Sequence, residues 1–285
     1  MAAVLALAAA CGQSRAGTAL ADGDQAAAYV GAKFEKAMSK LADSVLDARN
    51  VTNSADTYFR FDDKWVHNTI TSARTGSPES RVVHNRSQKN PDEIIDTFTP
   101  ADGAVEYVYL GPAYKSLAPT QWVSMPKPEA GLVQQCSWGG VQTACKMAEA
   151  VDGSYKADKK AVRSAKSAAD GSAELTVNVA FSKFLDDRVE VLPDSLLSKV
   201  GPQLRKSVVP TTIKLKPDGS LAEFVMAAKL SGDGHQLELR YDFRFTGAAT
   251  AQDLPKVPDA AQVTALPDSA AEQDFYQRLS QLQGN

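Results

Sequence analysis

Four Asp-Gly pairs constrain the fold of this 285-residue chain more than any other feature. They are Asp102-Gly103, Asp170-Gly171, Asp218-Gly219 and Asp233-Gly234, and each lies between two segments of alternating polar and apolar residues. Asp-Gly favours two-residue hairpin turns because both central positions need φ > 0. The pattern therefore predicts antiparallel strands that follow one another as a meander.

Strands are predicted wherever apolar residues recur at every second position. The predicted strands are 58–61, 65–71, 81–86, 94–98, 105–110, 121–125, 159–168, 172–181, 211–216, 221–230 and 236–245. In the last of these, Leu237 to Phe245 alternate with charged residues, which is typical of a sheet with one solvated face. The hairpin between 65–71 and 81–86 is expected to turn at Thr75-Gly76, which would place His67 opposite His84. Such a pair could be the start of a metal site, a pH sensor or an ordinary polar pair on the solvated face.

Helical periodicity is confined to a few segments. Asp24 can cap a helix that runs to about Arg49, and its apolar residues recur at three and four positions. This apolar stripe consists of Val30, Phe34, Met38, Leu41 and Val45. Shorter helices are expected at 145–151 and 194–205, and the capping-box pattern Ser269 to Glu272 predicts a terminal helix. The fold class is therefore α+β, a curved antiparallel sheet packed against an N-terminal amphipathic helix and a few short helices.

The N-terminal segment Met1 to Cys11 is apolar but too short to span a bilayer. It is typical of the hydrophobic part of a secretory signal, and the small residues before Cys11 resemble a bacterial lipobox. We expect residues 1–10 to be removed, Cys11 to be lipidated and 11–24 to be a tether, with a true start codon upstream that supplies the missing basic residues. The alternative is a buried N-terminal helix with an incidental cysteine. A single β-rich domain is expected over 25–267, followed by a C-terminal helix over 268–285.

The other two cysteines, Cys136 and Cys145, flank Gly139-Gly140. In an exported chain such a pair is expected to form a disulfide. A zinc site lacks further ligands close in sequence, and a redox pair favours a Cys-x-x-Cys spacing that is absent here.

Composition and motifs exclude several functions. With 31 Lys and Arg against 34 Asp and Glu, the chain has a net charge of −3, which makes nucleic acid an unexpected partner. The sequence carries no G-x-S-x-G, P-loop or H-E-x-x-H motif, and Pro126 breaks the helix that Ser124-x-x-Lys127 would need. We expect no enzyme activity, no cofactor and no metal.

Bulky side chains share one face of several predicted strands and need a covering layer. If the helices cover this face completely, it forms an ordinary hydrophobic core. If they do not, an apolar pocket large enough for a lipid remains. The candidate pocket residues are Phe59, Phe61, Tyr107, Tyr109, Leu175, Val177, Val179, Phe181, Ile213, Leu215, Leu237, Leu239, Tyr241 and Phe243. A separate basic stretch over 156–166 either guards an edge strand against aggregation or attracts anionic lipid headgroups.

The order of a lipobox-like Cys11, a tether, a helix and a sheet divided by Asp-Gly turns resembles actinobacterial cell-envelope lipoproteins of the LppX/LprG type and the related LolA/LolB carriers. The resemblance is carried best by 209–221 and by the strand that ends at Tyr241 to Phe243. It implies a half-open β-barrel closed by helices, and a monomer anchored to the outer face of the cytoplasmic membrane that binds or carries a lipid or other hydrophobic ligand. The alternative is an anchored interaction or sensor module with the same fold and a filled core.

Overall fold

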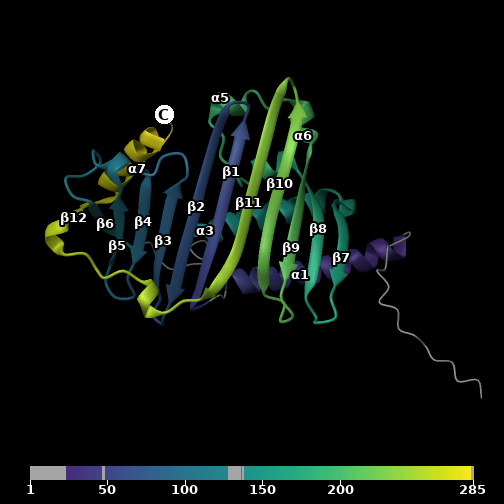
Figure 1. Cartoon of the computed structure of the whole chain (residues 1–285), viewed down its shortest axis with the longest axis horizontal. Helices are drawn as coiled ribbons and strands as arrows, with labels where there is room; N and C mark the ends of the chain where they lie inside the picture. The colour runs from purple at the N-terminus through teal and green to yellow at the C-terminus, as the bar shows by residue number, and fades with distance from the viewer. Residues whose placement is uncertain (1–23, 47–48, 128–135, 137, 284–285) are drawn as a thin grey trace, which may run out of the picture.

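Twelve strands form one continuous, open sheet that curves around a layer of helices (Figure 1). This computed structural model describes residues 24–46, 49–127, 136 and 138–283. The strands are β1 (Val51–Phe61), β2 (Lys64–Thr75), β3 (Ser80–Ser87), β4 (Ile94–Thr99), β5 (Val105–Leu110), β6 (Trp122–Pro126), β7 (Val162–Ser167), β8 (Ala173–Ala180), β9 (Val208–Leu215), β10 (Leu221–Gly232), β11 (His235–Ala248) and β12 (Val263–Ala265). The α-helices are α1 (Asp24–Leu46), α3 (Gly139–Ala157), α4 (Phe181–Asp186), α5 (Asp194–Leu197), α6 (Pro202–Lys206) and α7 (Ser269–Gln283).

The sheet consists of two antiparallel meanders joined side by side. One runs from β1 to β6 and the other from β7 to β11, and the long pair β1–β11 joins them. The strand order is β12-β6-β5-β4-β3-β2-β1-β11-β10-β9-β8-β7, so β12 and β7 are the two edges. The four Asp-Gly pairs that were predicted to form turns all lie between antiparallel neighbours, and their glycines have positive φ, for example 98° at Gly103 and 86° at Gly219. Only at Asp233-Gly234 do both residues have positive φ, as a two-residue hairpin turn requires. The predicted curved antiparallel sheet with helices is thereby confirmed.

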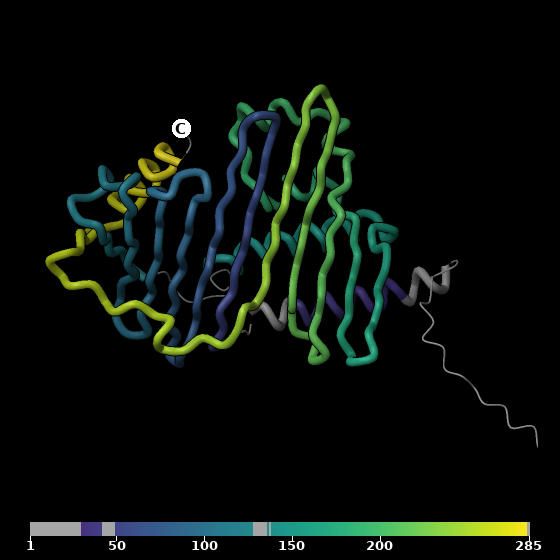
Figure 2. Tube along the Cα trace, viewed as in Figure 1, coloured from purple at the N-terminus to yellow at the C-terminus, as the bar shows by residue number. Residues whose placement is uncertain are grey.

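The path of the chain after β11 is not a hairpin. Figure 2 shows the segment from Ala248 running across the sheet toward its far edge, where β12 adds to β6 as the only parallel pair among the residues that the structure describes. Apolar residues of this crossing segment, Ala249 and Leu254, pack with Ala73, Val82 and Phe98 on the outer face of the sheet. The crossing segment therefore covers part of the face that the alternating pattern assigns to solvent.

Two apolar cores lie on the inner, concave face. The larger core joins α1, α3, α4 and α6 to β1 and β7–β11, and the smaller one joins α7 to β5 and β6. Phe275 and Leu279 of α7 are buried in the smaller core. The terminal helix therefore docks on the sheet, because the burial of two large apolar side chains offsets the entropy of ordering it.

Helices α3 and α4 differ in extent from their predicted form. Helix α3 is 19 residues long and extends beyond both ends of the short helix that was predicted over 145–151. A Cβ on Gly140 would lie 2.8 Å from Asn53 Oδ1, so glycine here lets the start of α3 approach β1 closely. Helix α4 begins at Phe181, which the alternating pattern placed in the preceding strand, because Phe181 and Phe184 both turn into the core.

The predicted His67–His84 pair is wrong. In the β2–β3 hairpin, Thr75 pairs with Ser80 and His84 pairs with Thr71, so the turn is four residues long and the register shifts by four positions. Each histidine contacts an aspartate instead. His67 Nε2 lies 3.0 Å from Asp56 Oδ2, and His84 Nδ1 lies 3.0 Å from Asp96 Oδ2.

Tyr241 is fully buried on β11, and its hydroxyl donates a hydrogen bond to the Glu190 carboxylate. Burial raises the pKa of the Glu190 carboxyl, although the hydrogen bond from Tyr241 opposes this shift. A raised pKa means that the folded protein binds this proton more tightly than the unfolded chain does. The contribution of Glu190 to stability is therefore greatest at low pH and is lost as the pH rises through its folded pKa.

We expect Glu190→Gln to remove this loss of stability at high pH, because the amide oxygen still accepts the Tyr241 hydrogen bond but carries no charge. The drop in unfolding free energy between pH 4 and pH 7 should be smaller in Glu190→Gln than in the parent. Tyr241→Phe should lower the unfolding free energy by about 1–3 kcal/mol at pH 7, and by less at pH 4, since it leaves a carboxylate without its donor. Urea unfolding at both pH values measures this, and identical pH dependence in all three proteins would contradict it.

Candidate functional site

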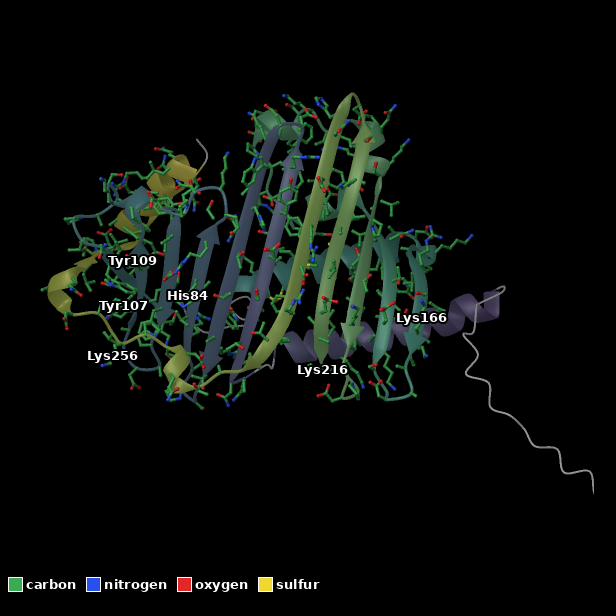
Figure 3. The ribbon with its side chains drawn as sticks, viewed as in Figure 1. His84, Tyr107, Tyr109, Lys166, Lys216 and Lys256 are labelled. Carbon is green, nitrogen blue, oxygen red and sulfur yellow. A yellow bond between two sulfur atoms is a disulfide. The ribbon has the colours of Figure 1, made fainter. Side chains whose placement is uncertain are left out.

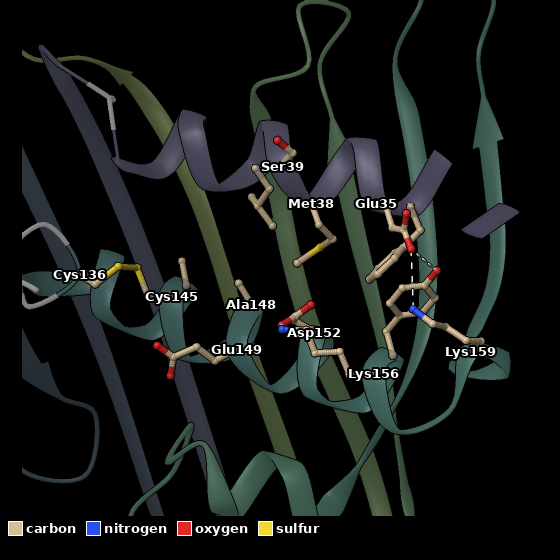
Figure 4. Close-up of a pocket in the computed structure, with 14 residues that line it drawn as sticks. Glu35, Met38, Ser39, Cys136, Cys145, Ala148, Glu149, Asp152, Lys156 and Lys159 are labelled. Carbon is tan, nitrogen blue, oxygen red and sulfur yellow. Dashed lines mark hydrogen bonds and ion pairs between the residues drawn. A yellow bond between two sulfur atoms is a disulfide. The ribbon is translucent and has the colours of Figure 1, made fainter. Parts of the chain in front are cut away.

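A cavity of about 580 Å³ lies between α1 and α3, and we call it the interhelical cavity. It is partly open to solvent (Figure 4). Its lining residues come from these two helices, from Cys136, which precedes α3, and from Lys159, which follows it. They are Phe34, Glu35, Met38, Ser39, Leu41, Cys136, Ala144, Cys145, Ala148, Glu149, Asp152, Tyr155, Lys156 and Lys159. Its volume lies within the range of about 300–1,000 Å³ that is typical of small-molecule sites.

The apolar stripe of α1 forms one wall of the interhelical cavity. Phe34 and Leu41 are buried, and Met38, between them in the stripe, is half-buried and lines the cavity. On the facing side, α3 presents Ala144 and Ala148, which are one helical turn apart. Because these alanines are small, the two helices leave space between them that larger side chains would fill.

The charged side chains at the rim are all paired with protein groups. At one end, Tyr155 Oη donates to Glu35 Oε1 at 2.9 Å, and Lys159 Nζ lies 3.7 Å from the same oxygen and 3.7 Å from the centre of the Tyr155 ring. Burial and then the hydrogen bond to Glu35 raise the pKa of the Tyr155 hydroxyl, so it stays protonated at neutral pH. Asp152 pairs with Lys156 at 2.6 Å.

Glu149, the remaining charged group of the rim, pairs with Lys146 at 2.6 Å. Every carboxylate that lines the interhelical cavity therefore has a cationic partner within the protein. A ligand would meet an apolar surface with a polar rim that is already satisfied, which selects by shape and hydrophobicity rather than by charge.

The Cys136–Cys145 disulfide lies at the other end of the interhelical cavity (Figure 4). The predicted pairing is present in the structure, with a Cα–Cα distance of 5.9 Å. Both cysteines line the cavity. The disulfide therefore attaches the chain before α3 to the helix that forms one wall. Cys11, the predicted lipidation site, lies outside the described residues.

Most of the candidate pocket residues of the sheet lie in the large core instead of around the interhelical cavity. Fully buried there are Phe59, Phe61, Leu175, Val177, Val179, Phe181, Ile213, Leu215, Leu237, Leu239, Tyr241 and Phe243. The helices therefore cover most of the concave face of this part of the sheet, and the interhelical cavity lies one layer further out, between the helices. Leu175 and Leu215 also line a smaller cavity on the other flank of α1.

Tyr107 and Tyr109 lie far from both cavities. On β5 they face the side of the sheet opposite to Val108 and Leu110, and Figure 3 shows them at the opposite end of the molecule from Lys166 and Lys216. In the sequence, the apolar stripe of α1 was the signal for the cavity that the structure contains. Three residues of this stripe, Phe34, Met38 and Leu41, line the interhelical cavity. The α3 wall gave a weaker signal, because its alanines and glycines suggest neither a core nor a site.

Among the described residues, no cluster of three or more His, Cys, Asp or Glu side chains is arranged so that it could hold a metal ion. In the part of the chain that the structure describes, no helix has the length and apolar character needed to cross a membrane.

Fold and cavity together define an α+β protein with an open, curved sheet and an apolar cavity between two covering helices. No family model matches the chain, and no curated protein matches it. Among solved structures, a DUF1329 family protein from Desulfovibrio piger aligns at 10% identity over 79% of this chain and 95% of its own, with a TM-score of 0.24. A beta-barrel-like protein of domain of unknown function DUF1849 from Brucella abortus aligns at 11% identity over 70% of this chain and 99% of its own, with a TM-score of 0.17.

Proposed function

We propose that this protein is a non-enzymatic lipoprotein of the cell envelope that binds or carries a lipid or other hydrophobic ligand in the interhelical cavity. The observation that carries the proposal is the cavity itself, which combines a volume of about 580 Å³ with walls built from Phe34, Met38, Leu41 and the α3 alanines. Burying an acyl chain against such walls is favourable by about 25 cal/mol per Å² of apolar surface. The resemblance to LppX/LprG and LolA/LolB carriers implies the same class of ligand.

A second candidate is an anchored interaction module without a ligand. The observation that favours it is the well-packed concave face, where side chains such as Phe61, Val177 and Phe243 are fully buried in the large core. The two candidates therefore differ only in whether the space between α1 and α3 is occupied.

Organic extraction of the protein purified from its native envelope, followed by mass spectrometry, tests the proposal. We expect a reproducible set of co-purified hydrophobic molecules at a substantial fraction of one molecule per protein. The control is the Ala148→Trp variant purified in parallel, because its indole ring occupies the interhelical cavity and should deplete the same molecules. If both the parent and the Ala148→Trp variant are reproducibly free of co-purified molecules, the result would support the interaction module instead.

The membrane anchor is tested separately with Cys11→Ser. Removal of the thiol prevents acylation, so we expect the variant to move from the membrane fraction to the soluble fraction, whereas Ser14→Ala should stay with the membrane. Fractionation followed by immunoblotting measures this. A Cys11→Ser protein that remains membrane-bound in high salt would show that the lipobox prediction is wrong.

A further inference from the structure

The first turn of α3 begins without the side-chain cap that most helix starts have. Its N-cap is Trp138, which has an extended backbone, with φ −116° and ψ 130°, and whose indole carries no hydrogen-bond acceptor. The first backbone N–H groups of a helix have no acceptor within the helix, and a Ser, Thr, Asp or Asn side chain at the N-cap usually supplies one. The start of this 19-residue helix therefore presents backbone donors that its own N-cap does not satisfy.

Three buried side chains around this turn also have a donor without an acceptor. They are Asn53 on β1, Arg74 on β2 and Trp138 itself, which are 1%, 7% and 4% exposed. Asn53 Nδ2, Arg74 Nε and Trp138 Nε1 have no hydrogen-bond partner among the described residues. An unpaired buried donor is costly, and native structures pair the large majority of such groups. Three of them at one place therefore point to a ligand that supplies acceptors.

These donors converge because the start of α3 lies directly on strands β1 and β2. A Cβ on Gly140 would lie 2.8 Å from Asn53 Oδ1, so the first turn of the helix touches the Asn53 amide. Asn53 Oδ1 accepts from Ser72 Oγ at 2.7 Å, which fixes the orientation of this amide. The Arg74 guanidinium carbon lies 5.8 Å from the centre of the Trp138 indole. The side chains of two strands and the N-cap of one helix thus meet at the first turn of α3.

The charges near these donors are balanced. Arg74 Nη2 pairs with Glu79, which also lies 4.0 Å from Arg81 Nη1. Arg81 Nε donates to Thr99 Oγ1 at 3.3 Å, and Thr99 Oγ1 donates to the buried Glu106 at 3.2 Å. Two arginines thus face two acidic residues, so an excess of positive charge is not what distinguishes this place. The groups that lack a counterpart are N–H donors.

An oxyanion suits a set of donors without acceptors. Its oxygens each accept more than one hydrogen bond, and the N–H groups and dipole at a helix start favour negative charge. A water molecule suits the same place less well, because its two hydrogens need acceptors of their own. Two acceptors of this region, Asn53 Oδ1 and the Glu79 carboxylate, are already engaged by Ser72 and Arg74.

We propose that the start of α3 binds a small oxyanion, a phosphate or carboxylate group, through its first-turn N–H groups and the donors of Asn53, Arg74 and Trp138. Cys136 and Cys145 place the disulfide end of the interhelical cavity beside the same part of α3 (Figure 4). The anion therefore comes either from solution or from the headgroup of a lipid whose chain lies in the interhelical cavity. The second source rests on the proposed ligand function, whereas the first does not.

Nuclear magnetic resonance of the indole groups tests the site directly, because the chain has three tryptophans and each gives one indole N–H signal. Inorganic phosphate and acetate are titrated separately at constant ionic strength. We expect at least one of them to shift the Trp138 signal saturably, while the signals of Trp65 on β2 and Trp122 on β6 stay in place. The absence of a saturable shift with either anion, or an equal shift of all three signals, would overturn the proposal in favour of buried water.

Trp138→Phe removes one donor and keeps an aromatic ring at the same position. It should weaken binding of the anion, measured by isothermal titration calorimetry, at least tenfold, as expected for the loss of a hydrogen bond to a charged group. Arg74→Lys keeps the charge opposite Glu79 but lacks the Nε–H, so it should weaken binding by a similar factor even if Trp138→Phe folds poorly.

The matched control is Trp65→Phe, which makes the same substitution at an exposed position of β2. It should bind the anion with the affinity of the parent. Equal affinity in the parent, Trp138→Phe and Arg74→Lys would place the anion elsewhere on the protein and overturn the proposal.

Dodecyl phosphate distinguishes the two sources of the anion. If the anion is a headgroup, dodecyl phosphate should shift the Trp138 signal at far lower concentration than inorganic phosphate does, and should displace the neutral probe N-phenyl-1-naphthylamine from the interhelical cavity. If it is a free anion, the two phosphates should bind alike and leave the probe in place. Displacement of the probe without a shift of the Trp138 signal would retain the ligand function and overturn the oxyanion site. A parent that binds phosphate but no probe would support the oxyanion site and count against the ligand function alone.

Discussion

Replacing Ala148 by tryptophan is expected to weaken the binding of a neutral hydrophobic probe such as N-phenyl-1-naphthylamine by at least tenfold. Ala148 is half-buried on α3 and lines the interhelical cavity, so an indole ring at this position occupies space that the probe needs. The probe then buries less apolar surface, and a tenfold loss of affinity corresponds to about 1.4 kcal/mol of binding free energy. Fluorescence titration measures the affinity directly.

Ala157→Trp is the matched control, because it makes the same substitution on the same helix at an exposed position outside the cavity. Its probe affinity should equal that of the parent. Ser39→Trp provides a second route to the same result from the α1 wall, where the side chain is exposed and the fold is less sensitive. Unchanged affinity in both cavity variants would show that the probe binds elsewhere.

Removal of the disulfide by Cys136→Ala and Cys145→Ala should lower the free energy of unfolding by about 3 kcal/mol. The bridge closes a loop with a sequence separation of nine, and this closure restricts the unfolded chain. Because the two cysteines also form one end of the interhelical cavity, probe affinity should fall together with stability. Guanidinium unfolding and the probe titration measure the two effects.

The control for this variant is a reductant. Parent protein should lose about the same unfolding free energy when it is reduced, whereas the double variant should be insensitive to reductant. Equal stability of the parent with and without its disulfide would mean that the crosslink shapes the end of the cavity without stabilising the fold.

Local signals determined much of the fold. Asp-Gly predicted the positions of hairpins at 102–103 and 218–219, where the glycine has positive φ, but both residues have positive φ only at 233–234. Alternation from Leu237 to Phe245 predicted a strand with one buried face, and the structure buries Leu237, Leu239, Tyr241 and Phe243. The α1 stripe likewise predicted its buried face, because helical periodicity is a property of the segment itself.

Contacts between distant segments were beyond such signals. The His67–His84 prediction failed because the length of the turn sets the register of the hairpin. The alternation of polar and apolar residues cannot reveal that length, since it is the same for registers that differ by an even number of residues. Helix α3 was underestimated because the reason for Gly140 is the close approach of Asn53 in β1, which is far away in sequence.

The sequence by itself determined the antiparallel strands, the N-terminal amphipathic helix and the partners of the disulfide, because each follows from spacing along the chain. Only the tertiary structure decided that β11 pairs with β1 to join two meanders, and that the helices bury most of the candidate pocket residues of the sheet. It also placed an apolar cavity between two helices, and three buried donors around the start of one of them. Cavities arise where facing surfaces fail to fill the space between them, and that depends on which surfaces meet.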